Sequence, residues 1–320
     1  MKTVIPIFFS VNDARSPFLA TAICSIKANA SMCYAYHVHI LYDTLSPENR
    51  EKLSRLADND FVIEFDLLAE RFANLPEVQR RNLTADVPLD VYFRFFIAEL
   101  YPQYDKAICL DTDVLVPGDI SLLFEEYLGA KLLGAAVDYS IQKIAPFMHY
   151  VDKYLGVDHQ NYVNSAVILL NCKGLRSARL AARFLDLAMN DGLETVAADQ
   201  DYLNVLCVSG IHYLDPDWNA MPSDCLCQLD NPQIIHFNIT AKPWLNETVP
   251  FDNLFWEYAA LSGYEAEIRA RRRAFLQDSA AVKNYRDVVK QLMHKAARLT
   301  QAPDSFRTRT IVPQELRLCS

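Results

Sequence analysis

Short apolar runs alternate with helical patterns through the first two hundred residues of this chain. Apolar runs of four to eight residues are typical of buried strands, and strands that alternate with helices form parallel sheets. We therefore expect an α/β fold with a mostly parallel central sheet flanked by helices. The expected strands are Val4–Val11, Tyr36–Tyr42, Phe61–Asp66, Lys106–Asp111, Leu133–Val137, Val163–Leu170 and Ile234–Phe237. The expected helices are Pro17–Asn29, Pro47–Ala57, Val91–Leu100, Ala178–Asn190 and Asp199–Val208.

The net charge of -9 is unevenly distributed. From Glu265 to Ser320 there are 12 Lys and Arg against 6 Asp and Glu, whereas the remaining 264 residues carry 19 basic and 34 acidic side chains. An acidic body argues against nucleic acid as the main partner. We expect a main domain over residues 1–264 and a helical basic C-terminal tail over residues 265–320, although no Gly/Ser linker marks the boundary.

The composition also bears on location. No stretch approaches the roughly 18 apolar residues of a membrane span. The run Val4–Phe9 is short for a signal-peptide core and has no small-residue cleavage site after it. Of the eight scattered cysteines, only Cys225 and Cys227 are close, and they lack a second pair for a zinc site. We therefore expect reduced thiols and a cytoplasmic location.

The eight glycines form neither G-x-G-x-x-G nor G-x-x-x-x-G-K-[ST]. A Gly-rich loop therefore does not cradle phosphates in this chain. If a diphosphate is bound, a cation and basic side chains must carry most of its charge, so clustered carboxylates are of interest.

Asp111 and Asp113 directly follow the apolar run that begins at Lys106. In an extended chain a spacing of two residues places both side chains on one face. Burying two carboxylates together in apolar surroundings costs free energy unless a cation neutralises them. Ligands also bind at the carboxyl ends of such strands. A solvated turn is the competing interpretation, but the apolar run resumes at Val114–Val116 and fits it badly. We predict a metal site here.

His236 lies in a short apolar run, shortly before Lys242. A lone histidine in such a run is more often a satisfied core residue. As a third ligand it would favour Mn²⁺ over Mg²⁺, and Lys242 would meet a phosphate oxygen. Other polar residues within apolar patterns are Arg94, Asp138, Asn164, Ser165, Asp199 and Gln200. His37 and His39 share a strand face with no acid nearby in the sequence, and we interpret them as ordinary strand residues.

Six ordered signatures together resemble glycosyltransferase family 8, which contains bacterial lipopolysaccharide galactosyl- and glucosyltransferases. They are Tyr92–Arg94, Leu110–Val114, Gly134–Asp138, Asn164–Asn171, Asp199–Asn204 and His236–Trp244. The resemblance spans roughly Thr3 to Trp244. It implies a nucleotide-sugar-binding fold of the glycosyltransferase A type, a UDP-hexose donor, Mn²⁺ with Mg²⁺ as the alternative, and retention at the anomeric carbon.

The resemblance also implies roles for individual residues. The metal ligands would be Asp111, Asp113 and His236. The catalytic residues would be Asp138, Asp199 and Gln200. The nucleotide-sugar-binding residues would be Ser10, Asn12, Arg94, Asp111, Asn164 and Lys242. The chain departs from the family pattern, which usually has an acid, a tyrosine and two glycines at the positions of Asn12, Arg15, Ala166 and Ile239.

We therefore expect a retaining glycosyltransferase that transfers galactose or glucose from a UDP-sugar to a glycan such as lipopolysaccharide or another cell-surface saccharide. Retention needs either a protein nucleophile or front-face attack by the acceptor, and we favour front-face attack with Asp199 and Gln200 beneath the sugar. One alternative is a catalytically weak sugar-nucleotide-binding protein. Another is a haloacid-dehalogenase-type phosphatase, whose D-x-D motif usually follows the first strand rather than the fourth.

The tail contains a basic amphipathic helix. Its apolar stripe consists of Val282, Tyr285, Val288, Val289, Leu292, Ala296 and Leu299, and Lys and Arg lie largely off this stripe. Such a helix either lies on an anionic membrane surface or packs its stripe on the body with its charges in water. A membrane-bound acceptor would favour the first interpretation, a peripheral position on the inner face of the membrane.

Overall fold

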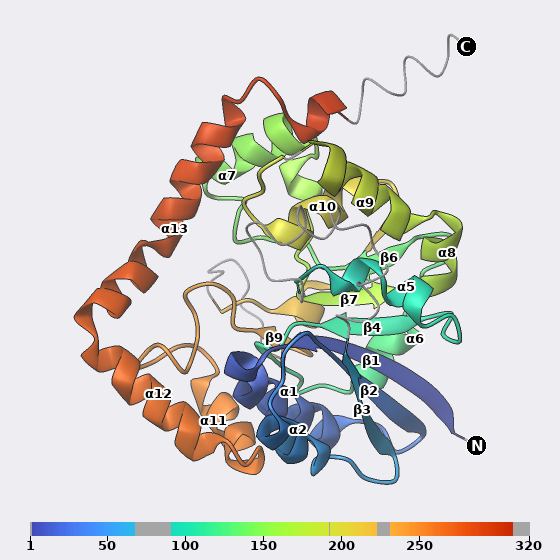
Figure 1. Ribbon diagram of the computed structural model, residues 1–320, viewed down its shortest axis with the longest axis vertical. Helices are drawn as coiled ribbons and strands as arrows, with labels where there is room; N and C mark the ends of the chain where they lie inside the picture. Colours follow the sequence, from blue (N-terminus) through green and yellow to red (C-terminus); the bar gives the residue numbers. More distant parts are fainter. Residues whose placement is uncertain (1, 68–90, 192, 223–230, 310–320) are drawn as a thin grey trace.

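The computed structural model describes residues 2–67, 91–191, 193–222 and 231–309 of the chain. Within these ranges the main sheet has seven strands in the order β3-β2-β1-β4-β7-β6-β8 (Figure 1). Adjacent strands are parallel except where β7 pairs with β4 and β6, so the expected mostly parallel sheet is confirmed. The strands are β1 (Thr3–Val11), β2 (Tyr34–Tyr42), β3 (Phe61–Leu67), β4 (Ala107–Leu110), β6 (Leu133–Ala135), β7 (Val167–Leu170) and β8 (Ile211–Tyr213).

Helices cover both faces of this sheet. Because side chains alternate along a strand, Phe8 belongs to the apolar cluster on one face and its neighbours Ile7 and Phe9 to the cluster on the other. Phe8's face is covered by α5 (Ile97–Leu100), α7 (Ala145–His149), α8 (Cys172–Ser177), α9 (Leu180–Asp191) and α10 (Ala198–Cys207). The opposite face is covered by α1 (Ser16–Asn29), α2 (Pro47–Ser54), α6 (Ile120–Glu125), α11 (Asp252–Leu261) and α12 (Glu265–Gln277).

A second, two-stranded sheet joins distant parts of the sequence. Its strands are β5 (Val114–Leu115) and β9 (Ile235–His236), which pair antiparallel with Val114 opposite His236. Three residues separate β5 from the end of β4 at Leu110, and they include a turn at Thr112 and Asp113. The expectation that the chain is extended from Asp111 to Asp113 was therefore wrong, because β5 belongs to a different sheet and the chain turns to reach it.

Two other expected elements differ in detail. Residues 91–100 do not form one helix: the 3₁₀ turn η3 (Phe93–Phe95) precedes the short α5. The aromatic side chains of Tyr92, Phe93, Phe95 and Phe96 are all buried, and one face of a regular helix would not bury all four. Strand β7 begins only at Val167, because the backbone N–H groups of Ser165 and Ala166 donate to the side chains of Gln200 and Asn164 instead of to a neighbouring strand.

The described part of the tail, residues 265–309, packs on the body. Helix α13 (Ser279–Thr300) runs from α12 to α7 along one side of the molecule (Figure 1). Its residues Ala296 and Leu299 are buried in the cluster on Phe8's face, while Lys283 and Arg286 are exposed. The stripe therefore faces the body and the basic side chains face solvent. The division into residues 1–264 and 265–320 remains our proposal.

Two further sequence expectations concern location. Among the helices of the described residues, none is both long and apolar enough to cross a membrane. The described cysteines are free, and Cys225 and Cys227 lie outside the described residues. The free cysteines are Cys24, Cys33, Cys109, Cys172 and Cys207.

Candidate active site

The two sheets bring Asp111, Asp113 and His236 together. The pairing of β5 with β9 sets His236 beside the turn, and the N–H of Phe237 donates to the carbonyl of Asp113 at 2.9 Å. One potential ligand atom from each of Asp111, Asp113 and His236 lies within 4.8 Å of the others. The predicted metal ligands thus form one group, although they come from opposite halves of the chain.

Asp113 is held by a lysine. The Nζ of Lys242 lies 2.5 Å from Oδ2 of Asp113 and donates to the carbonyl of Phe237 at 2.6 Å. The Nε2 of His236 is 3.7 Å from Oδ1 of Asp113. Burial alone would raise the pKa of Asp113, but Lys242, His236 and Arg15 outweigh it and hold the pKa well below its usual range. Asp113 is therefore ionised at neutral pH.

Asp111 is held by an arginine that it shares with Asp199. Arg94 is buried, its Nη2 lies 2.7 Å from Oδ1 of Asp111, and its Nε lies 2.9 Å from Oδ2 of Asp199. Its Nη1 donates to the carbonyl of Ser165. Burial raises the pKa of Asp199 to about 6. Arg94 lowers this pKa, but the negative charge on Asp111 partly offsets the effect of Arg94. One guanidinium thus links the metal-ligand group to the start of α10.

A second polar network lies beside Asp199. Oδ2 of Asp138 accepts from the side-chain amides of both Asn164 and Gln200 at 3.0 Å. The antiparallel direction of β7 explains the position of Asn164, because the start of β7 lies beside the end of β4 and the N–H of Asp111 donates to the carbonyl of Ala166 at 2.8 Å. The structure therefore brings together residues from all six of the signatures that the sequence suggested separately.

Asp201 positions the segment that carries Asp199 and Gln200. It is fully buried and accepts hydrogen bonds from Tyr162 Oη at 2.6 Å, Tyr150 Oη at 2.8 Å, and the backbone N–H groups of residues 196 and 197 at 2.9 Å. Next to this segment Ala198 has a φ of 27°, which is unfavourable for a residue with a side chain. Four hydrogen bonds to one carboxylate help to hold this conformation.

These groups open onto a pocket of about 490 Å³. Its polar side includes Asp111, Asp138, Asn164, Asp199, Gln200 and His236. Its other side, which we call the apolar wall, consists of Ile144, Phe147, Val289 and Leu292. Two of the wall residues come from the basic tail, which the sequence did not connect with the site. Ile239 also lines the pocket, and its φ of 28° lies in the region that favours glycine, the residue usual in the family at this position.

The remaining predicted residues do not line the pocket. Arg94 and Lys242 contact the aspartates without lining it. Ser10 and Asn12 lie at the carboxyl end of β1, where the Asn12 side chain accepts from the N–H of Arg15 at 3.2 Å. The sequence did not identify Asp201 and Ser140 as site residues. The Oγ of Ser140 donates to Asp138 at 2.5 Å. The acid pair Asp199 and Asp201 in one helix was the available signal, but N-capping explains it equally well.

The donor set fits a divalent cation. Two carboxylates and one imidazole are suitable ligands for Mn²⁺. Burial lowers the pKa of His236 against the opposing pull of Asp113 and Asp111, which favours the neutral, metal-binding form of the ring. Within the described residues, Nδ1 of His236 is buried without a hydrogen-bond partner. The other ring nitrogen, Nε2, is the one that faces Asp113, at 3.7 Å from Oδ1.

Comparison with known proteins finds relatives that are glycosyltransferases. Glycosyltransferase GlyF of Streptococcus pneumoniae is 27% identical over 184 residues, which are 54% of this chain and 42% of GlyF, so the match spans less than half of that relative. Lipopolysaccharide 1,2-glucosyltransferase of Escherichia coli is 26% identical over 246 residues, covering 70% of this chain and 68% of that protein.

A solved structure extends the likeness to the fold. The galactosyltransferase LgtC in complex with donor and acceptor sugar analogs matches with a TM-score of 0.64 at 24% identity, over 80% of this chain and 96% of that chain. This likeness supports a glycosyltransferase A-type fold. The profile described as glycosyl transferase family 8 matches residues 6–248, well over half of the chain. The chain therefore belongs to glycosyltransferase family 8.

Proposed function

We propose that this glycosyltransferase transfers galactose or glucose from a UDP-sugar to a saccharide or glycolipid acceptor, such as lipopolysaccharide, with retention at the anomeric carbon. The observation that carries the proposal is one continuous pocket. The group of Asp111, Asp113 and His236 borders it, and Asp138, Asn164, Asp199 and Gln200 lie along it. A diphosphate and a hexose require this succession of a cation site and hydrogen-bonding groups.

In this proposal Asp111, Asp113 and His236 hold Mn²⁺, with Mg²⁺ as the alternative. The ion would act as a Lewis acid that stabilises charge on the departing diphosphate. Lys242 contributes a second positive charge, because its ammonium group already lies 2.5 Å from Asp113 and has a phosphate oxygen as an alternative anionic partner. Ser10 and Asn12, at the end of β1, would contact the nucleotide.

The hexose would lie against the network of Asp138, Asn164 and Gln200, whose amides and carboxylate suit sugar hydroxyls. Asp199 and Gln200 at the start of α10 would stabilise the positive charge that develops at the anomeric carbon. Arg94 shares its charge between Asp111 and Asp199, so it orients both carboxylates. We favour front-face attack by the acceptor, because Arg94 already pairs with the carboxylate of Asp199 and lowers its nucleophilicity.

The acceptor would enter beside the apolar wall. Val289 and Leu292 of α13 line the pocket, whereas Arg286 and Lys290 on the same helix are exposed. A helix with this arrangement would place its basic face against anionic lipid while its other face contributes to the site. We propose a cytoplasmic location with peripheral contact to the inner face of the membrane.

The test is a donor screen in Mn²⁺ that measures nucleoside-diphosphate release for UDP-glucose, UDP-galactose and other nucleotide sugars. We expect one UDP-hexose to be preferred, and we expect EDTA or Asp113→Asn to abolish release while unfolding stays cooperative. Asp105→Asn is the matched control, because its side chain is 77% exposed and pairs with Arg176 instead. Unchanged release by Asp113→Asn in EDTA would contradict the proposal.

The same screen separates the alternatives. Donor binding with neither transfer nor slow hydrolysis would favour a catalytically weak sugar-nucleotide-binding protein. Phosphate release from simple esters would favour a phosphatase, although membership of family 8 and the position of the two aspartates after β4 argue against one.

A further inference from the structure

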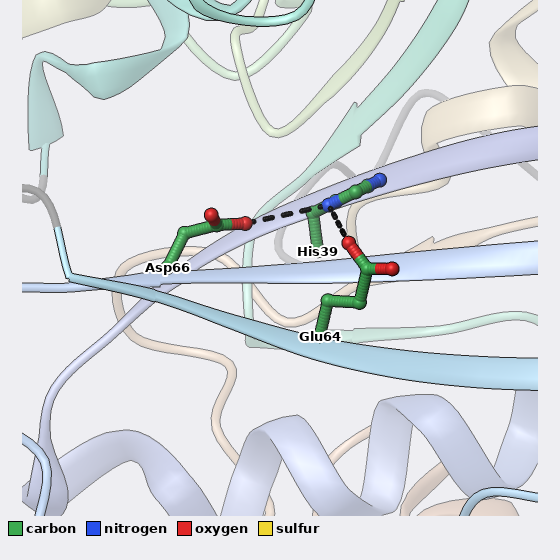
Figure 2. Close-up of side chains that lie close together, drawn as sticks. All are labelled: His39, Glu64 and Asp66. Atoms are coloured by element: carbon green, nitrogen blue, oxygen red, sulfur yellow. Dashed lines mark hydrogen bonds and ion pairs between the residues drawn. The ribbon is translucent and has the colours of Figure 1, made fainter.

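A second group of potential metal ligands lies on β2 and the outermost strand β3. His39 of β2 is in register with Glu64 of β3, and Asp66 follows Glu64 by two residues on the same face. Figure 2 shows both carboxylates directed at the same nitrogen of His39. Sequence proximity does not reveal this group, because the acids lie on a different strand from the histidine.

The distances in this group suit a bridging ion better than direct hydrogen bonds. Nδ1 of His39 is 3.4 Å from both Oε2 of Glu64 and Oδ2 of Asp66. Hydrogen bonds between charged groups of this kind are typically about 2.7–2.9 Å long. By contrast, two ligands that are each about 2.1 Å from one tetrahedral ion lie about 3.4 Å from each other.

The ring of His39 is already oriented for binding. It is nearly fully buried, and it stacks on Phe8 with ring centroids 4.7 Å apart and planes 12° apart. Its Nε2 lies 3.0 Å from the hydroxyl of Tyr104, which in turn lies 3.3 Å from Nδ1 of His37. If Nε2–H donates to Tyr104, the lone pair of Nδ1 faces the two carboxylates. Metal-binding histidines commonly have such an outer hydrogen bond on the second ring nitrogen.

A third histidine–acid group shows what an ordinary ion pair looks like in this chain. Nδ1 of His159 lies 3.0 Å from both oxygens of Asp152, and the backbone N–H of His159 donates to the same carboxylate at 2.9 Å. Direct hydrogen bonds therefore account for that group. At His39 the two distances are equal and longer, and the contact with Asp66 is a long hydrogen bond of 3.4 Å.

We propose that His39, Glu64 and Asp66 bind a divalent transition-metal ion, Zn²⁺ in preference to Mg²⁺, with water completing the coordination. The imidazole nitrogen favours Zn²⁺, which takes both nitrogen and carboxylate ligands, over Mg²⁺, which prefers oxygen ligands and water. The side chain of Glu64 is 52% exposed, which leaves a route for the ion and its water. The ion would join the outermost strand β3 to β2, and this site is independent of the proposed transferase function.

The experiment uses the full chain with Asp113→Asn, which disables the candidate active site. The protein is treated with EDTA, the chelator is removed, and Zn²⁺ is then titrated in. We expect one Zn²⁺ per chain by calorimetry and by metal analysis after gel filtration. Adding Glu64→Gln and Asp66→Asn should weaken binding by at least ~10-fold, and Tyr104→Phe by ~10- to 100-fold through loss of the outer hydrogen bond. Zn²⁺ should also raise the melting temperature only when both acids are present.

The control is His159→Gln, which removes the histidine of the ordinary ion pair and should leave Zn²⁺ binding unchanged. Glu64→Gln changes an exposed side chain, so loss of folding is not expected to obscure the result. Equal Zn²⁺ affinity and stoichiometry with and without Glu64 and Asp66, or no binding in the Asp113→Asn background, would overturn the proposal. Neither result depends on whether the protein transfers sugar.

Discussion

Asp199 should make the stability of this protein depend on pH in a way that one substitution removes. Its carboxylate is buried beside Arg94, and burial raises its pKa to about 6 from an ordinary value of 3.8. In the unfolded chain the carboxylate is solvated and returns to the ordinary value. The folded protein therefore holds this proton more tightly than the unfolded protein does.

The sign and size of the effect follow from this difference. A raised carboxyl pKa stabilises the fold fully below pH 3.8, and this contribution is lost as the pH rises through 6. A shift from 3.8 to about 6 corresponds to about 3 kcal/mol in total, of which about 2–3 kcal/mol is lost between pH 4 and pH 7.5. Asp199→Asn cannot titrate and should not show this loss.

The assay is urea unfolding of the wild type and Asp199→Asn at pH 4, 5, 6 and 7.5, in EDTA. Other titrating groups act in both proteins, so the difference between their unfolding free energies isolates Asp199. We expect the wild type to lose about 2–3 kcal/mol relative to the variant across this range. A difference that stays constant with pH would refute the assigned environment of Asp199.

Three further predictions concern the arginine, the apolar wall and the basic helix face. Arg94→Met leaves the buried carboxylate of Asp199 and the partly exposed carboxylate of Asp111 unpaired, and it should lower the unfolding free energy by about 3–5 kcal/mol. Urea denaturation measures this loss, and a value below about 1 kcal/mol would contradict the role of Arg94. Leu292→Ala should raise the KM for acceptor while donor hydrolysis in Mn²⁺ stays unchanged, and an unaltered KM would remove Leu292 from the acceptor site. Arg286→Glu with Lys290→Glu should reduce sedimentation with anionic vesicles, and equal sedimentation would end the membrane proposal.

Much of the fold was predictable because the signals are local. The apolar run of β1 and the Ser46–Pro47 helix start are read directly from neighbouring residues, and both occur where expected. The turn at Asp113 was not predictable from local pattern. Residues Val114 and Leu115 are apolar because they form β5, and nothing near them in the sequence shows that their partner is β9.

The candidate site was predictable as a set of residues but not as an arrangement. Polar residues inside apolar patterns identified Arg94 and Asp199, yet the ion pair between them joins η3 to α10, which lie far apart in the sequence. The contribution of Val289 and Leu292 to the pocket depends on where α13 packs. The group at His39 depends on the register of β2 and β3. Each of these is a long-range contact, which local periodicity does not encode.

The bond between Lys242 and Asp113 implies thermodynamic coupling between cation and donor. Because the chain supplies its own counterion, the aspartate is neutralised before any metal arrives, and an incoming ion must compete with an ammonium group 2.5 Å away. A diphosphate offers that ammonium a new anionic partner. Each ligand should therefore tighten the binding of the other by the same factor, and Mn²⁺ alone should bind weakly until the sugar nucleotide is present.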